Sequence, residues 1–288
     1  MRTPAESKRA GTRIGAGLSA LGLLVFALIG YGGTPTATAK QPTKLQVSVF
    51  PCPIPPSDYF GTPATPQHAP LTLSVAAALA PPKGGQLYGA KFPDSAPSYL
   101  LGTMSMACTG TWASAVGGQI MIATPTAGHA RGVTMWIAAG GVGPSTDLAC
   151  PYIPAVLSAD RALRGNASLC GRPSEDVVHQ IPTGTPALYA AVAWVPSEVK
   201  DPNLAGSGDG TDPTVALYTA RIIPVVAGNT TPSAEGQMIS CTLPVAEAQI
   251  CRASLEFFLA KESEVGAHVR APDLTNMKGA LSAFLVAH

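Results

Sequence analysis

Charged side chains are scarce in this chain. Asp, Glu, Lys and Arg make up 12% of its 288 residues, about half the usual share for a soluble domain. A protein that binds nucleic acid usually has a basic patch or stripe, and this chain has too few cationic side chains to form one. We therefore exclude nucleic acid as a partner. The alanine-rich composition is typical of bacteria with GC-rich genomes, so we expect a bacterial source and a polar, weakly charged surface.

Short catalytic and metal-binding motifs are also missing. There is no Cys-x-x-Cys pair and no histidine at ligand spacing from a cysteine, which excludes a zinc site. The Gly-x-Ser-x-Gly motif of serine hydrolases is absent. Residues 143–147 begin like it but have Asp147 in place of the last glycine. The glycine runs at 117–118 and 140–143 lack the Lys-Ser or Lys-Thr pair of a phosphate-binding loop, so we interpret them as turns.

Aromatic residues make up only 6% of the chain. Trp112, Trp136 and Trp194 all fall in strand-like runs. Such rings bury a large apolar area, so we expect them to pack in or beside the core rather than to form a platform for sugars.

The first 39 residues have the order of an export signal. Four basic residues precede an uncharged apolar stretch at 14–29, and the small residues Ala37-Thr38-Ala39 follow. The apolar stretch is shorter than the roughly 20 residues of a membrane-spanning helix, so we expect cleavage after Ala39. The alternative is an uncleaved anchor that holds the chain in the membrane through residues 14–31. Four of the 18 basic and one of the 17 acidic residues lie before residue 40, so the rest carries a net charge of −2.

All six cysteines follow this segment, where an exported chain meets an oxidising environment. Sequence alone does not select among the pairings that six cysteines allow. Short separations favour two pairs and leave a third by elimination: Cys241–Cys251, Cys150–Cys170 and Cys52–Cys108.

Alternating apolar and polar residues predict a series of β-strands after a short linker at 40–44. Turn-forming residues at 125–132 are expected to close a hairpin between two of them. The predicted strands lie at 45–49, 71–75, 99–112, 120–124, 133–138, 186–195 and 214–226.

The last part of the chain changes to helical spacing. Apolar residues recur every three or four positions and predict amphipathic helices over 245–262 and 273–287. We therefore predict a β-rich α+β fold over 45–288, an antiparallel sheet or sandwich closed by one or two C-terminal helices and stapled by disulfides. The alternative is two subdomains with a boundary in 197–213.

The loop at 201–212 partly matches a calcium-binding loop, in which side-chain oxygens converge on one ion. Ala205 offers no ligand, and the flanking segments are strand-like rather than helical. Calcium is thus the one candidate cofactor, and the alternative is a polar connection between two strands. The candidate ligands are Asp201, Asn203, Ser207, Asp209 and Asp212.

Two histidines are candidate catalytic bases, His129 and His179. Glu175 and Asp176 precede His179 by four and three residues. A carboxylate would therefore orient its ring if that turn is helical. The alternative is an exposed loop histidine without a catalytic role.

Three classes of function stay open. We expect a non-catalytic module of the bacterial cell envelope or extracellular space, which binds an unidentified ligand or has a structural role. The first alternative is a secreted hydrolase whose active site is scattered through the sequence, around His129 or His179. The second is the ectodomain of a membrane-anchored sensing or secretion component.

Overall fold

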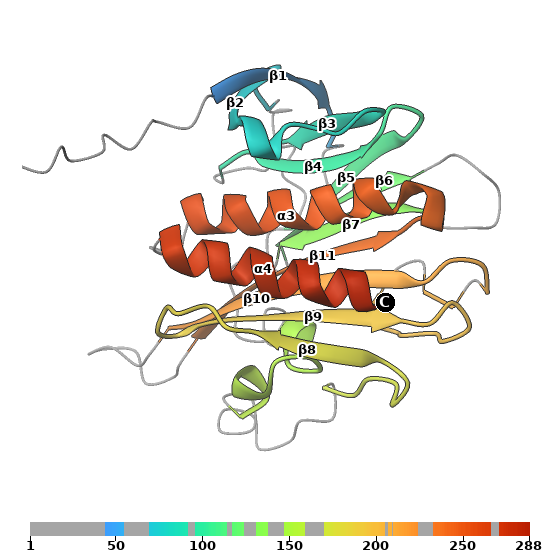
Figure 1. Ribbon diagram of the computed structural model, residues 1–288, viewed down its shortest axis with the longest axis vertical. Helices are drawn as coiled ribbons and strands as arrows, with labels where there is room; N and C mark the ends of the chain where they lie inside the picture. The colour runs from blue at the N-terminus through green and yellow to red at the C-terminus, as the bar shows by residue number, and fades with distance from the viewer. Residues whose placement is uncertain are drawn as a thin grey trace, which may run out of the picture. The chain divides into compact units, whose positions relative to one another are not determined.

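Two β-sheets and two long C-terminal helices make up the fold seen in the computed structural model (Figure 1). The structure describes residues 44–54, 69–91, 96–113, 117–123, 131–137, 147–158, 170–204, 207–208, 210–223, 233–265 and 271–288.

The larger sheet has seven strands, and every neighbouring pair in it is antiparallel. Its order is β5-β6-β7-β11-β10-β9-β8, so β11 joins two runs of consecutive strands. The bounds are β5 (Ala107–Ala113), β6 (Gly117–Ala123), β7 (Gly132–Ile137), β8 (Val177–Ile181), β9 (Leu188–Val195), β10 (Thr214–Ile223) and β11 (Ser233–Thr242).

The smaller sheet has the order β2-β1-β3-β4. Strand β1 pairs antiparallel with β2 but parallel with β3, so the antiparallel prediction does not hold for this one pair. The bounds are β1 (Lys44–Pro51), β2 (Thr72–Ala76), β3 (Gly85–Ala90) and β4 (Ser98–Thr103), and a 3₁₀ turn η2 (Ala77–Leu79) follows β2.

Helices α3 (Ala248–Val265) and α4 (Ala271–Ala287) lie across one face of the larger sheet (Figure 1), and a 3₁₀ turn η3 (Val245–Glu247) precedes α3. Helix α3 packs against β4, β10 and β11, and α4 packs against α3 and β8. Their buried residues recur at helical spacing, because only one stripe of each helix faces the sheet. These residues include Leu255, Phe258, Leu259, Met277, Leu281 and Phe284.

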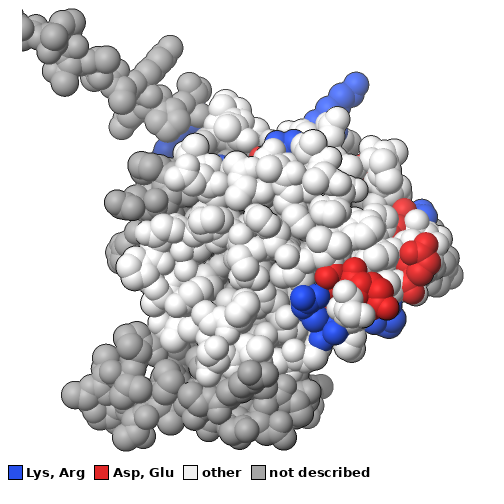
Figure 2. Space-filling view, turned by 60° about the horizontal axis from the view of Figure 1, so that its bottom comes forward, with Lys and Arg blue, Asp and Glu red and all other residues white. Residues whose placement is uncertain are grey.

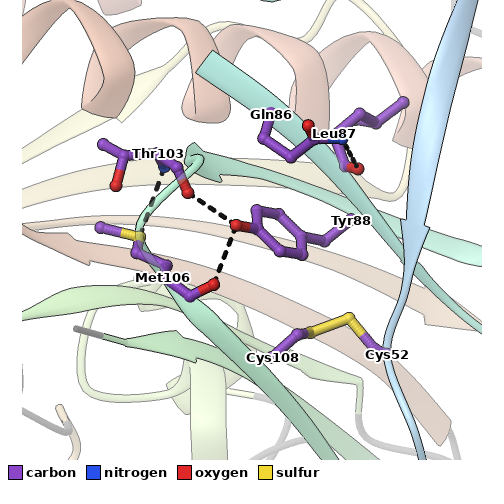
Figure 3. The surroundings of a disulfide bond; sticks show 7 residues. All are labelled: Cys52, Gln86, Leu87, Tyr88, Thr103, Met106 and Cys108. Atoms are coloured by element: carbon purple, nitrogen blue, oxygen red, sulfur yellow. Dashed lines mark hydrogen bonds between the residues drawn. A yellow bond between two sulfur atoms is a disulfide. The ribbon is translucent and has the colours of Figure 1, made fainter. Parts of the chain in front are cut away.

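The fold class is therefore a β-rich α+β fold with disulfides, as predicted, and both helices are present close to their predicted bounds. The predicted strand at 99–112 is wrong, because the chain forms β4 and β5 with a turn between them. Figure 3 shows the reason: the hydroxyl of Tyr88 hydrogen-bonds Thr103 O at 2.6 Å and Met106 O at 3.0 Å. This contact from β3 fixes the turn between β4 and β5, and no local pattern in the sequence predicts the contact.

Strands β3, β8 and β11 were not predicted. Strand β3 buries the adjacent residues Leu87 and Tyr88, and β11 buries Met238 and Ile239. When both faces of a strand are covered, apolar residues no longer alternate with polar ones, so the period-2 signal is lost.

All six cysteines are paired, as Cys52–Cys108, Cys150–Cys170 and Cys241–Cys251. Two of these are the pairs that short separation favoured, and Cys52–Cys108 is the pair that was left by elimination. The first links the segment after β1 to β5 (Figure 3), and the last joins β11 to α3. Each disulfide typically adds about 2–4 kcal/mol by restricting the unfolded chain.

Candidate functional site

A pocket with a volume of about 380 Å³ lies where β9, β10 and β11 meet the start of α3 and the end of α4. Pockets that bind small molecules usually enclose about 300–1,000 Å³. This pocket therefore falls in the range of a small-molecule site.

Apolar side chains from separate parts of the chain form most of the pocket wall. Trp194 comes from β9, Val215 from β10 and Leu285 from α4. Leu243 and Val245 come from the connection between β11 and α3. Val245, in this connection, is 81% exposed.

The Cys241–Cys251 disulfide is part of the same wall. It joins the end of β11 to the first turns of α3, the two elements on either side of the connection through Leu243 and Val245. A covalent bond between these elements restricts how far they can separate. The wall is thus held in place before any ligand arrives.

Three polar side chains also contribute to the lining: Gln249, Arg252 and His288. The Nε of Arg252 lies 2.9 Å from a Glu256 oxygen, and its Nη2 donates to Ser282 Oγ at 2.5 Å. Arg252 therefore links α3 to α4, and its positive charge is paired with the negative charge of Glu256.

The imidazole ring of His288 is positioned by aromatic contacts. It stacks on Trp194 with 5.5 Å between ring centroids, and it lies 4.7 Å from the ring of Phe284. Trp194 is half-buried, as the sequence predicts, but it also lines the pocket. His288 was not among the predicted site residues, because nothing in the sequence indicates that the end of α4 lies beside β9.

The predicted catalytic histidines are not brought into an acid–base arrangement in the described structure. His179 lies in strand β8, so the helical turn that would orient it with Glu175 or Asp176 does not form. Its ring instead lies 6.1 Å from that of Phe284. His129 lies outside the described residues.

The predicted calcium ligands in the described structure already hold other partners. Asp201 Oδ1 accepts hydrogen bonds from Asn203 N and Nδ2, each at 2.8 Å. Ser207 Oγ hydrogen-bonds Asp201 N and O at 3.0 Å. Asp212 forms an ion pair with Arg131 at 2.7 Å, and Asp209 lies outside the described residues.

Among the described residues, no group of three or more His, Cys, Asp or Glu side chains is arranged to hold a metal ion. Nor does the described part of the chain include a helix long and apolar enough to cross a membrane. Comparisons with family models, curated proteins and solved structures found no match to the chain.

Proposed function

We propose that the chain after residue 39 is an exported, non-catalytic binding module, which takes a small and mainly apolar molecule into the pocket between β9–β11 and the two helices. The observation that carries this proposal is the pocket itself, about 380 Å³ of mostly apolar wall held by a disulfide. The polar side chains in the lining, Gln249, Arg252 and His288, favour a ligand that also has a polar end.

The chemistry of the lining supports a binding role over catalysis. Its described residues include no side-chain hydroxyl, free thiol or carboxylate, so the wall offers no nucleophile for His288 to activate. The polar groups present can orient a ligand by hydrogen bonding and charge without reacting with it.

The surface and the disulfides support the location. In the view of Figure 2 most of the described surface is white, that is, neither acidic nor basic; acidic side chains gather mainly at the lower right, and basic side chains lie beside them and along the top. Three disulfides fit an oxidising compartment, since cytosolic thiols are kept reduced. Mass spectrometry of the protein from its source cells tests this part: export with cleavage predicts a disulfide-bonded chain that begins at Lys40, and a reduced cytosolic chain would contradict it.

Binding can be tested with anilinonaphthalene sulfonate, an apolar fluorescent probe with one anionic group. Ala248 is exposed and lines the pocket, so Ala248→Trp places a large ring over the site without disturbing the core. We expect the dissociation constant of the probe to rise by at least about tenfold, equivalent to about 1.4 kcal/mol.

Ala246→Trp is the matched control, because Ala246 is exposed two residues away and is not among the lining residues. This variant should bind the probe like the wild type. Equal affinities of both tryptophan variants would show that the probe does not use the pocket, and the proposal would fail.

A further inference from the structure

The pocket contains a stacked pair of aromatic rings, Trp194 from β9 and His288, which follows the end of α4. Both residues line the pocket. The imidazole of His288 lies nearly parallel to the indole of Trp194, with 5.5 Å between ring centroids and 23° between ring planes. Trp194 is half-buried and packs against the apolar core of the helix face. The imidazole therefore covers ring surface that Trp194 would otherwise present to the pocket.

This cover is held less firmly than the rest of the pocket wall. His288 is exposed and follows Ala287, the last residue of α4. Its ring has a second aromatic contact, with Phe284 one helical turn earlier, at 4.7 Å and a tilt of 47°. No covalent bond fixes the ring, in contrast to the disulfide in the same wall. Exposed side chains change rotamer within nanoseconds, so the imidazole can leave the indole without a movement of the backbone.

A ligand ring does not fit between the two stacked rings. Contacting carbon atoms lie about 3.5–4.0 Å apart, so a ring between two others needs roughly 7 Å or more from one outer ring to the other. The 5.5 Å between Trp194 and His288 is too short for this arrangement. A ring that stacks on the covered surface of Trp194 must therefore take the place of the imidazole.

The indole of Trp194 favours one class of ligand for this exchange. Aromatic rings attract each other when they stack with an offset, beyond what the burial of their area contributes. A planar bicyclic ring covers more of an indole than the five-membered imidazole does, so the exchange gains contact. A puckered ring or a flexible chain lacks this gain and leaves the imidazole in place.

We propose that the ligand of this pocket carries a planar aromatic ring, which replaces the imidazole of His288 on the indole of Trp194. This ligand class depends on the binding function proposed above and narrows it to aromatic molecules with a polar end. His288 is then a removable cover that competes with the ligand for Trp194. Gln249 and Arg252, the other polar residues of the lining, are the available partners for the polar end.

Competition by His288 has a measurable sign. While the imidazole covers Trp194, only the uncovered fraction of molecules binds the ring, and the apparent dissociation constant is the intrinsic one divided by that fraction. The attraction of a typical aromatic pair raises that constant by about two- to tenfold. His288→Ala should therefore tighten the binding of an aromatic ligand, whereas the loss of an ordinary contact residue weakens binding.

Isothermal titration with 2-naphthoate and decahydro-2-naphthoate tests the ligand class. The two anions share one carbon skeleton, but only the first is planar and aromatic. The saturated anion has the larger apolar surface, so apolar burial alone would favour it. We expect 2-naphthoate to bind more tightly than its saturated counterpart.

Substitutions at the end of α4 test the cover. His288→Ala should lower the dissociation constant of 2-naphthoate by about two- to tenfold and leave that of the saturated anion unchanged. His288→Phe keeps a ring over Trp194 and should not tighten binding. Val286→Ala is the matched control, because Val286 is exposed at the same end of α4 and is not among the lining residues. It should bind both anions like the wild type.

Nuclear magnetic resonance of labelled histidines follows the cover directly. In the free protein the ring current of Trp194 shifts the Hε1 signal of His288, and His288→Ala identifies that signal. Saturating 2-naphthoate should move the signal away from its stacked position, and decahydro-2-naphthoate should leave it there.

Tighter binding of the saturated anion, or a His288→Ala variant that binds 2-naphthoate no more tightly than the wild type, would overturn the proposal. The binding function would still stand if Ala248→Trp blocks the anilinonaphthalene sulfonate probe, since the pocket would then take apolar molecules without selecting a ring. An Ala248→Trp variant that binds the probe like the wild type would contradict the binding function as well.

Discussion

The two faces of the seven-stranded sheet bury different kinds of side chain. On the helix face, residues such as Leu217 and Ile239 pack against the apolar stripes of α3 and α4. On the opposite face, the segment at 147–158 covers Ala216 and Tyr218. The acids Asp176 and Asp201 are also buried on this opposite face. On the helix face, Ser254 is the buried polar side chain that lacks a hydrogen-bond partner in the described structure.

This difference has consequences for stability. Apolar burial stabilises a face at any pH, because no proton is bound or released. A buried polar group stabilises a face only while its partners are in place and its protonation state is right. We therefore expect the helix face to set the stability of the whole domain and the opposite face to open first, as a local unit.

Large-to-small substitutions on each face should separate these roles. Leu255 in α3 is fully buried, so Leu255→Ala should lower the free energy of global unfolding by about 2–5 kcal/mol. Ile153, on the opposite face, is 1% exposed. Ile153→Ala should mainly increase local hydrogen exchange at 153–157 and should shift the urea midpoint less than Leu255→Ala does.

The measurement is urea unfolding combined with hydrogen exchange, both at pH 5. Equal losses of global stability in the two variants would show that both faces unfold as one cooperative unit. The proposed order of opening would then be wrong.

Removing one disulfide from each face should have a smaller effect on the free energy of unfolding than Leu255→Ala. It also tests whether the two faces differ in how they support the pocket. Cys241–Cys251 spans 10 residues beside the pocket, and Cys150–Cys170 spans 20 residues under the opposite face. Replacing either pair by alanine should cost about 3 kcal/mol, because loop closure depends only weakly on loop length. Only loss of the first pair should weaken binding of anilinonaphthalene sulfonate, since only that pair lines the pocket.

Fluorescence titration and urea unfolding on the same two double variants check this prediction. If both variants lose probe affinity in proportion to their loss of stability, the pocket has no special dependence on its disulfide. The wall would then be positioned by general packing.

Local patterns in the sequence predicted the elements whose residues depend on near neighbours. The helix spacing around Leu255 and the short separation between Cys241 and Cys251 are signals of this kind, and the structure has both features. Strand β11 was missed because both of its faces are covered, so that the adjacent residues Met238 and Ile239 are both buried. The β4–β5 turn was missed because Tyr88 fixes it from another strand.

The candidate sites depend almost entirely on contacts between distant segments. The pocket combines Trp194, Val215 and Leu285, and no spacing in the sequence relates these positions. The predicted calcium loop did single out Asp201, but for a metal and with different neighbours. Asp176 entered only as a partner of His179, which lies in strand β8 rather than in a helical turn.

The smallest expected effect on stability comes from removing the hydroxyl of one of the two stacked tyrosines, Tyr152 and Tyr218, on the face opposite the helices. The hydroxyl of Tyr218 is buried without a hydrogen-bond partner in the described structure, so Tyr218→Phe removes an unsatisfied group and should leave the free energy of unfolding unchanged or raise it by up to about 1 kcal/mol. Tyr152→Phe, its matched control, takes the donor from Asp201 and should cost about 1–3 kcal/mol. Thermal unfolding at pH 5 compares them, and a loss of stability in Tyr218→Phe as large as that in Tyr152→Phe would show that both hydroxyls stabilise the fold. This face of the sheet would then depend on both stacked tyrosines rather than on the single hydrogen bond from Tyr152 to Asp201.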